Sequence, residues 1–246
     1  MKKFRADIHI HTVLSPCGDL EMSPDNIVKK AKEKKLNIIG ITDHNSLKQC
    51  SVIKNIAKQY GIYTLTGVEI TTKEEVHCLA FFDKNEEILK FQNYIDKYLP
   101  DIKNNTDIFG YQVVVDKDNN IIESVDKLLI SAIDQSIEQI EKKVHSLNGI
   151  FIPAHINKSK FSIISQLGFI PKTLIIDALE LSKHISKKDF IEKFEYLKNY
   201  TFIQNSDSHY IDNIADVVTI YKMNEISFDE IKKALHNIDG REVIVN

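Results

Sequence analysis

The sequence predicts a single domain of the α/β class, in which strands and helices alternate around a barrel. The first 70 residues alternate short apolar strands with amphipathic helices, an order typical of a parallel sheet. The chain has 246 residues, of which 43% are hydrophobic and 27% charged, and this composition suits one barrel with a full core. We therefore expect one domain over residues 1–246.

The first elements follow from helix-start signals and hydrophobic periodicity. Ser23 followed by Pro24 predicts the start of a helix, because a capping residue before a proline at the first helical position is a start signal. A second amphipathic helix over residues 51–60 ends at Gly61. Apolar runs predict strands over residues 5–12, 37–42, 62–70 and 76–82.

The alternation is interrupted by residues 84–130. This segment predicts a helix over 86–99, then a loop, then a hairpin of 111–115 with 121–125. It holds too little apolar material for a core of its own, so we expect an insertion into the barrel, and its place after a strand makes it a candidate lid. The alternation then resumes, with helices over 136–147 and 188–197, strands over 149–153, 178–181 and 201–204, and a C-terminal βαβ stretch ending at Val245.

Charge, hydrophobic runs and cysteine content indicate which partners and which cellular compartment to expect. The formal charge of −3 gives no basic excess, so we expect no long nucleic acid and no membrane as partner. No stretch approaches the roughly 20 apolar residues that span a bilayer, and the basic first residues precede no apolar run. The three cysteines show no CxxC spacing, which argues against a disulfide framework. We expect a cytoplasmic protein, whose oligomeric state the sequence leaves open.

Two histidines near the start of the chain lie two residues apart. His9 and His11 share one strand, so their side chains point to the same face about 6.6 Å apart along the chain, close enough to bind one metal ion. Taken alone, a pair of this kind fits better with two histidines at a polar strand end. The pair indicates a metal site only if other residues of the chain supply further ligands.

The same residue types recur at later strands. Glu69 interrupts an otherwise apolar strand, and because a buried unpaired carboxylate is costly, it predicts a nearby cation. Five further histidines and aspartates stand at or just past other strand ends. Each of them alone could cap an element or border the core, but together with Glu69 they predict a metal site at one end of the barrel, where α/β barrels have their active sites. These others are His44, His77, His155, Asp207 and His209.

In this order and spacing the motifs resemble the polymerase and histidinol phosphatase family, the PHP superfamily. The resemblance runs from about residue 6 to about residue 210 and includes an HxH, a TDH, a glutamate in a GVE strand, two single histidines and a DxH. It implies a distorted (β/α)7 TIM-like barrel that holds two or three divalent ions of Zn, Mn or Fe. It also implies three groups of ligands: His9, His11, Glu69 and Asp207; Glu69 as a bridge with His77 and His155; and His44 with His209.

The loop after the HxH departs from the family pattern. Family members place an aspartate five residues, or a histidine six residues, beyond the second histidine, where this chain has Pro16 and Cys17. Cys17 could bind as a thiolate, which would favour Zn²⁺. Asp19 could reach the site instead, or Cys17 could be a small packed residue, and the sequence leaves these alternatives open.

The resemblance implies hydrolysis of a phosphate ester by a metal-activated hydroxide, because divalent ions lower the pKa of a bound water. We expect a small phosphorylated substrate: a nucleoside phosphate, a short oligonucleotide or a sugar phosphate. Glu69 and Asp207 would take part directly, and Asp43 would orient a ligand. Alternatives are a histidinol-phosphate phosphatase and a metal-binding module without catalysis.

Other polar residues carry weaker signals. Lys73 and Lys183 follow strand ends and are candidate phosphate contacts, although solvent-exposed lysines are common in this chain. The three histidines outside the motifs are expected to be ordinary surface or helix residues: His145, His184 and His236.

Overall fold

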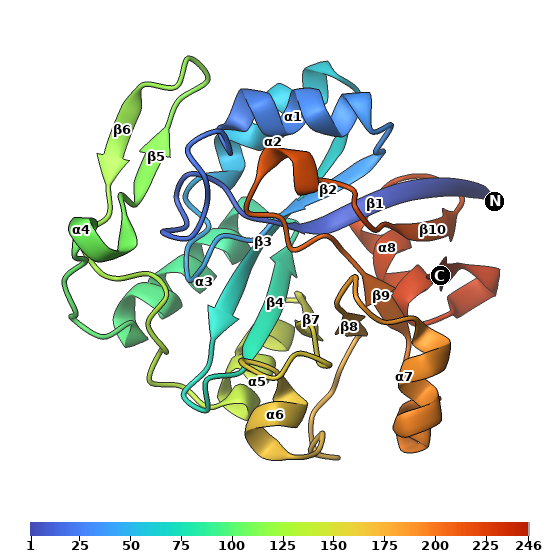
Figure 1. Cartoon of the computed structure of the whole chain (residues 1–246). Helices are drawn as coiled ribbons and strands as arrows, with labels where there is room; N and C mark the ends of the chain where they lie inside the picture. Colours follow the sequence, from blue (N-terminus) through green and yellow to red (C-terminus); the bar gives the residue numbers. More distant parts are fainter. Residues whose placement is uncertain (246) are drawn as a thin grey trace.

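The computed structural model describes residues 1–245, which form a curled sheet surrounded by helices (Figure 1). In this part of the chain the main sheet has seven strands, in the order β11-β10-β1-β2-β3-β4-β7. Their bounds are β1 Lys2–Ile10, β2 Ile38–Ile41, β3 Tyr63–Thr71, β4 His77–Phe82, β7 Ile150–Pro153, β10 Thr219–Met223 and β11 Glu242–Ile244.

Most helices begin within a residue of their predicted starts, whereas a short helix over Thr106–Phe109 lies where the sequence predicted a loop, because the Asn105 side chain accepts a hydrogen bond from the N–H of Asp107. Pro24 opens α1, which buries Ile27 and Val28 against the sheet. Ser136 accepts a hydrogen bond from the backbone N–H of Gln139 in a capping box that starts α5. The helices are α1 Pro24–Glu33, α2 Cys50–Gln59, α3 Asn85–Tyr98, α4 Thr106–Phe109, α5 Ile137–Ser146, α6 Ile163–Leu167, α7 Lys187–Lys193 and α8 Phe228–Leu235.

The sheet is mixed, whereas the sequence predicted a parallel one. Only β1, β2 and β3 pair in parallel; β4 is antiparallel to β3 and β7, and β10 is antiparallel to β1 and β11. Residues 72–76 alone join β3 to β4, and a link this short cannot cross over to a parallel strand. The α/β class is therefore confirmed, while the regular (β/α)7 count is not.

A separate parallel pair of strands lies between the two edges of the curled sheet. It consists of β8 Leu179–Leu181 and β9 Phe202–Gln204. The backbone N–H of Ile156, just past β7, donates to the carbonyl of Glu180 at 2.9 Å, and that of His11 donates to Ser208 at 3.0 Å. These contacts bring β8 and β9 beside both β7 and β1, so strand ends from across the sequence face one another.

The inserted segment contains the predicted helix and hairpin. The hairpin strands are β5 Val113–Val115, which is buried, and β6 Ile121–Ser124, which is exposed. The side-chain amide of Gln49, just before α2, donates to the carbonyl of Val115 and accepts from its N–H, both at 2.9 Å. The hairpin is thus fastened beside α2, and its role as a lid stays a prediction.

Two further observations bear on the setting of the protein. Cys17, Cys50 and Cys78 are free thiols. Within residues 1–245, every helix is too short or too polar to traverse a lipid bilayer.

Candidate metal centre

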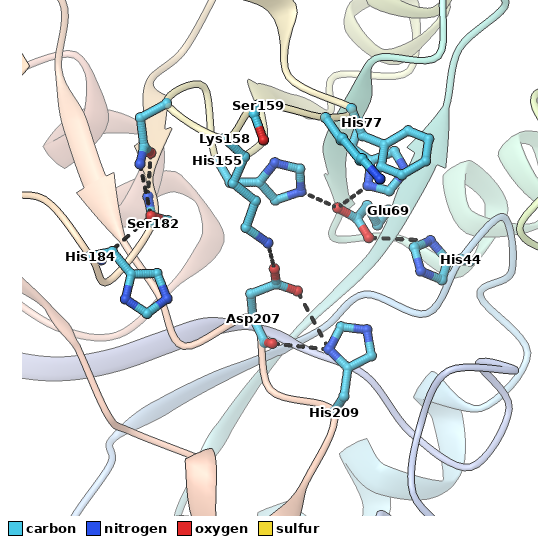
Figure 2. A pocket seen from close by; sticks show the side chains of 13 residues that line it. His44, Glu69, His77, His155, Lys158, Ser159, Ser182, His184, Asp207 and His209 are labelled. Carbon is cyan, nitrogen blue, oxygen red and sulfur yellow. Dashed lines mark hydrogen bonds and ion pairs between the residues drawn. The ribbon is translucent and has the colours of Figure 1, made fainter. Parts of the chain in front are cut away.

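The carboxylate of Glu69, on β3, lies at the centre of a ring of imidazoles (Figure 2). Its side chain is 1% exposed, so water contributes almost nothing to its solvation. Five histidine nitrogens approach its two oxygens: to Oε1, His77 Nδ1 at 3.0 Å, His155 Nε2 at 3.1 Å and His9 Nε2 at 3.4 Å; to Oε2, His44 Nδ1 at 3.2 Å and His11 Nε2 at 3.3 Å.

These histidines come from four separate places in the sheet. His9 and His11 lie at the carboxyl end of β1, and His44 and His155 follow β2 and β7. His77 instead lies at the amino end of β4. Because β4 runs antiparallel to β3, its amino end meets the carboxyl ends of the parallel strands at one edge. The reversal of one strand therefore completes the site.

Asp207 and His209 close the ring from the loop after β9. Asp207 Oδ1 lies 3.4 Å from His9 Nε2 and 3.5 Å from His11 Nε2. The backbone of Asp207 has a φ of 52°, and that of His155 has a φ of 28°, in the region that residues other than glycine rarely adopt. Backbone strain of this kind concentrates at functional sites, where the surrounding structure enforces it.

The geometry fits divalent cations better than a network of hydrogen bonds. Nδ1 of His44 is buried and close to Glu69, yet it forms no hydrogen bond. Nε2 of His9 and Nε2 of His11 face each other at 3.3 Å. The side chains form three sets, and within each set the ligand atoms all lie within 4.8 Å of one another. The sets are His9, His11 and Glu69; His44, Glu69 and His77; and His11, Cys17, His44 and His209. Imidazole, carboxylate and thiolate are the donors that zinc and related ions prefer.

The charges of the cluster are strongly coupled. Burial alone would raise the pKa of Glu69, but His77, His9 and His44 hold that pKa well below its usual range. The same opposition of burial and histidine charge lowers the pKa of Asp207. Burial lowers the pKa of His209 to about 4. The carboxylates are therefore ionised and His209 is neutral near pH 7, which are the forms that bind metal.

A buried carboxylate that the sequence reasoning missed supports His9. Glu180, on β8, lies 3.0 Å from His9 Nδ1 through each of its oxygens. It also accepts hydrogen bonds from the backbone N–H of His155 at 2.9 Å and from Asn205 Nδ2 at 2.8 Å. Glu180 interrupts an apolar strand as Glu69 does, so the signal that identified Glu69 was present for it too.

Asp43 acts on the loop after β1. It accepts hydrogen bonds from the backbone N–H of Thr12 at 2.7 Å and from the hydroxyl of Ser15 at 2.7 Å. That hydroxyl lies 3.0 Å from His11 Nδ1. Asp43 thus reaches the cluster through Ser15, and its orienting role stays a prediction.

Cys17 and Asp19 occupy different positions in this loop. Cys17 Sγ belongs to the set with His11, His44 and His209, while Asp19 Oδ1 accepts from the backbone N–H of Glu21 at 2.8 Å. The local turn therefore engages the Asp19 carboxylate. Although Cys17 is exposed as a residue, desolvation of its thiol beside the cluster, with the charge of Glu69 added, raises the pKa of that thiol to about 12.

A cavity of about 470 Å³ opens beside the cluster. Neither of the lysines proposed from the sequence lines it: Lys73 pairs with Asp134 at 2.9 Å and Lys183 with Asp216 at 2.6 Å. The described residues of the 84–130 segment do not line it either. Its walls beyond the cluster come from two segments, one of Asn157, Lys158, Ser159, Lys160 and Phe161, the other of Ser182 and His184.

The histidines outside the motifs divide between two environments. His145 and His236 both bind Asp177, at 3.0 and 2.7 Å, and are not part of the Glu69 ring. His184 is exposed and lines the cavity without touching Glu69 (Figure 2). Its position marks it as a residue that a substrate could meet.

The amino-acid sequence matches a known family of proteins. The family model for the PHP domain matches residues 7–155. The uncharacterised protein YqxK of Bacillus subtilis is 25% identical over 277 residues, covering 100% of this chain and 65% of YqxK. A 5′-3′ exoribonuclease of Haemophilus influenzae is 33% identical over 82 residues, 32% of this chain and 29% of that enzyme. The chain thus spans less than two thirds of these relatives.

Comparison with solved structures shows a shared fold. Endonuclease Q of Pyrococcus furiosus has a TM-score of 0.72 at 19% identity, over 98% of this chain and 58% of that one. A structure of endonuclease Q with a 27-mer duplex, whose abasic lesion is at the active site, has a TM-score of 0.75 with the same identity and coverage.

These comparisons correct one expectation and confirm another. The expectation of a small substrate and no long nucleic acid is wrong, because this fold also holds duplex DNA at an active site in endonuclease Q. A net charge of −3 does not exclude nucleic acid, since bound cations can supply the positive field locally. The family match extends over more than half of the chain, and the chain belongs to the PHP domain family.

Proposed function

We propose that this protein is a metal-dependent phosphoesterase that hydrolyses phosphodiester bonds in nucleic acid. The observation that carries the proposal is the buried Glu69 carboxylate within 3.4 Å of five imidazole nitrogens, at the base of a cavity. The likeness to an exoribonuclease and to endonuclease Q supports nucleic acid as the substrate class.

The donor groups account for two or three divalent ions. Bound ions would neutralise non-bridging phosphate oxygens and lower the pKa of a water molecule. Glu69, His11 and His44 each belong to two of the three sets of ligand atoms, and of these Glu69 has two oxygens, so it is the donor best suited to bridge two ions. Cys17 completes the third set, which favours zinc there because thiolate is a soft donor.

The chain's other residues hold these donors in place and contact the substrate. Glu180 fixes the ring of His9, and Ser15 holds His11 from the far side. Lys158 forms an ion pair with Asp207 at the cavity wall and presents a positive charge to an entering phosphate (Figure 2). Lys158 takes the phosphate-binding role that the sequence had suggested for Lys73 and Lys183.

The test is hydrolysis of labelled single-stranded and duplex oligonucleotides, with an aryl phosphate alongside, after reconstitution with Mn²⁺ or Zn²⁺. We expect cleavage products with the wild type and a loss of at least about a hundredfold with Glu69→Gln, because the shared donor is weakened. Glu86→Gln, on the exposed face of α3, is the matched control. Protein that binds metal and hydrolyses none of these substrates would instead be a metal-binding module without catalysis.

A further inference from the structure

We propose that residues 157–161, the loop after β7, form a subsite for one unpaired nucleotide, with Phe161 stacking on the base and Lys158 binding the phosphate. This inference rests on the proposed function and extends it, because it names the part of a nucleic acid that the cavity recognises. It also separates a nucleotide from a sugar phosphate, which has no aromatic base to stack.

Phe161 is held in an exposed and strained position beside the metal cluster. Its ring stacks on the ring of His77, with centroids 4.7 Å apart and planes 13° apart. The residue remains 41% exposed and lines the cavity. Its φ is 57°, which is costly for a bulky side chain, and its carbonyl accepts a hydrogen bond from the N–H of His77 at 2.8 Å. The backbone therefore keeps an aromatic ring accessible where core packing does not require one.

The loop that carries these side chains is fixed by hydrogen bonds. The backbone N–H of Lys158 donates to the carbonyl of His155 at 2.9 Å, and the Ser162 hydroxyl donates to the carbonyl of Lys158 at 2.7 Å. Asn157 and Ser182 exchange two hydrogen bonds of 2.8 Å across the cavity wall. A loop anchored at both ends keeps Lys158 and Phe161 in defined positions, which recognition requires.

Positive charge lies next to the aromatic ring. The Lys158 side chain is 40% exposed and reaches Asp207, while Lys160 is exposed on the same wall. Lysine beside an accessible aromatic ring is the combination with which proteins bind single-stranded nucleic acid, since the base stacks and the backbone pairs with the cation. A cavity of about 470 Å³ falls within the range of small-ligand sites and suits one nucleotide rather than a duplex. The bound nucleotide must therefore be unpaired or turned out of its helix.

The test is binding of fluorescent oligothymidylate, compared with an oligomer of equal length and phosphate number that carries abasic residues, by anisotropy with Ca²⁺ present. We expect the wild type to bind the base-bearing oligomer about tenfold more tightly, in the range measured for stacking of one base. Phe161→Leu, which still covers His77 with an apolar side chain, should remove the preference. Lys158→Met should weaken binding of both oligomers by a similar factor. Phe169→Leu, at an exposed phenylalanine that does not line this cavity, is the matched control.

Equal wild-type affinity for both oligomers, or a preference that survives Phe161→Leu, would overturn the inference. Phe161 would then only shield His77 from water, and Phe161→Ala, which uncovers that ring, should lower the metal content without changing the base preference. Hydrolysis is measured separately. A base preference without cleavage of any substrate would refute the proposed function and leave the subsite standing.

Discussion

Both carboxylate oxygens of Glu180 lie 3.0 Å from Nδ1 of His9, whereas Nε2 of the same ring faces Glu69 at 3.4 Å. Burial would raise the pKa of Glu180, but the charge and hydrogen bond of His9 lower it, so the carboxylate is ionised and only accepts hydrogen bonds. Nδ1 of His9 is then the donor, and Nε2, which faces Glu69, is the nitrogen that would give up its proton to bind a cation.

Replacing Glu180 should therefore weaken metal binding without removing a ligand. Glu180→Gln replaces one of the two oxygens that accept hydrogen bonds from His9, the His155 N–H and Asn205. We expect metal affinity to fall by about 10- to 100-fold, as is typical when the hydrogen-bond partner of a ligating histidine is lost. Calorimetric titration of metal-depleted protein measures this. The control is Glu230→Gln, at a buried glutamate paired with Arg241, which should leave the metal affinity unchanged. Equal metal affinity in the two variants would show that Glu180 does not orient His9.

Cys17 and Asp19 can be distinguished by spectroscopy. Cys17→Ser should remove the thiolate-to-metal charge-transfer band of the Co²⁺-substituted protein and lower its metal content by one ion, because the Cys17 thiol lies among His11, His44 and His209. Asp19→Asn should keep the band, since that carboxylate binds the Glu21 N–H. A wild-type spectrum without such a band would exclude Cys17 as a ligand.

A second cluster, away from the metal site, should make stability depend on pH. His145 lies 3.0 Å from Asp177 and 2.6 Å from Glu141. The hydrogen bond with Asp177 contributes most to raising the pKa of His145 above 6.5, and burial opposes it. Because the folded state has the higher pKa, the stabilisation is fully present below about pH 6.5 and is lost as the pH rises through the folded pKa.

The measurement is urea unfolding of the wild type and His145→Gln at about pH 5.5 and about pH 8.5. We expect the wild type to be more stable than the variant by about 1 kcal/mol at the lower pH, and the difference to shrink at the higher pH. The side chain is 23% exposed, which limits the effect. A difference that grows with pH would contradict the assigned ion pairs.

Gly40, on β2, permits close approach to β1, which carries His9 and leads directly to His11. A Cβ at this position would lie 2.4 Å from the carbonyl oxygen of Ile8 and 2.6 Å from its Cα. Both atoms belong to the backbone, so the strands must separate to make room. Gly40→Ala should lower the free energy of unfolding by about 1–3 kcal/mol. Gly61→Asn is the control, because a Cβ there meets no atom within 4 Å and asparagine tolerates the φ of 70°. Equal stability of the two variants would count against the close packing of β2 on β1.

Hydrophobic periodicity predicted where the elements lie but not how the strands run. The strands and most helices fall within a few residues of their predicted bounds, because each depends on local patterns such as the capping box at Ser136. Strand direction depends on pairing between distant segments. The short link over residues 72–76 was the one local sign that β4 must be antiparallel, and the strand-helix rhythm before it masked that sign.

In the candidate site, too, local sequence patterns predicted some residues, while contacts between distant segments determine the others. The structure brings together the predicted histidines and carboxylates, because the spacing of HxH and DxH fixes which side chains share a face. Residues that support or extend the site were missed. Lys158 and Phe161 lie in a loop whose course depends on hydrogen bonds to His155, His77 and Ser162, which no periodic pattern encodes. Their roles, like the ligand assignments, remain predictions.

Glu69 is proposed to be a shared donor of a multinuclear metal site that performs hydrolysis. The most direct measurement is the metal content of wild type and Glu69→Ala by elemental analysis after reconstitution with Zn²⁺ or Mn²⁺, with oligonucleotide hydrolysis on the same samples. We expect about two to three ions per chain and cleavage for the wild type, and loss of both in the variant. A variant that keeps the wild-type metal content, or that cleaves its substrate after losing metal, would contradict it.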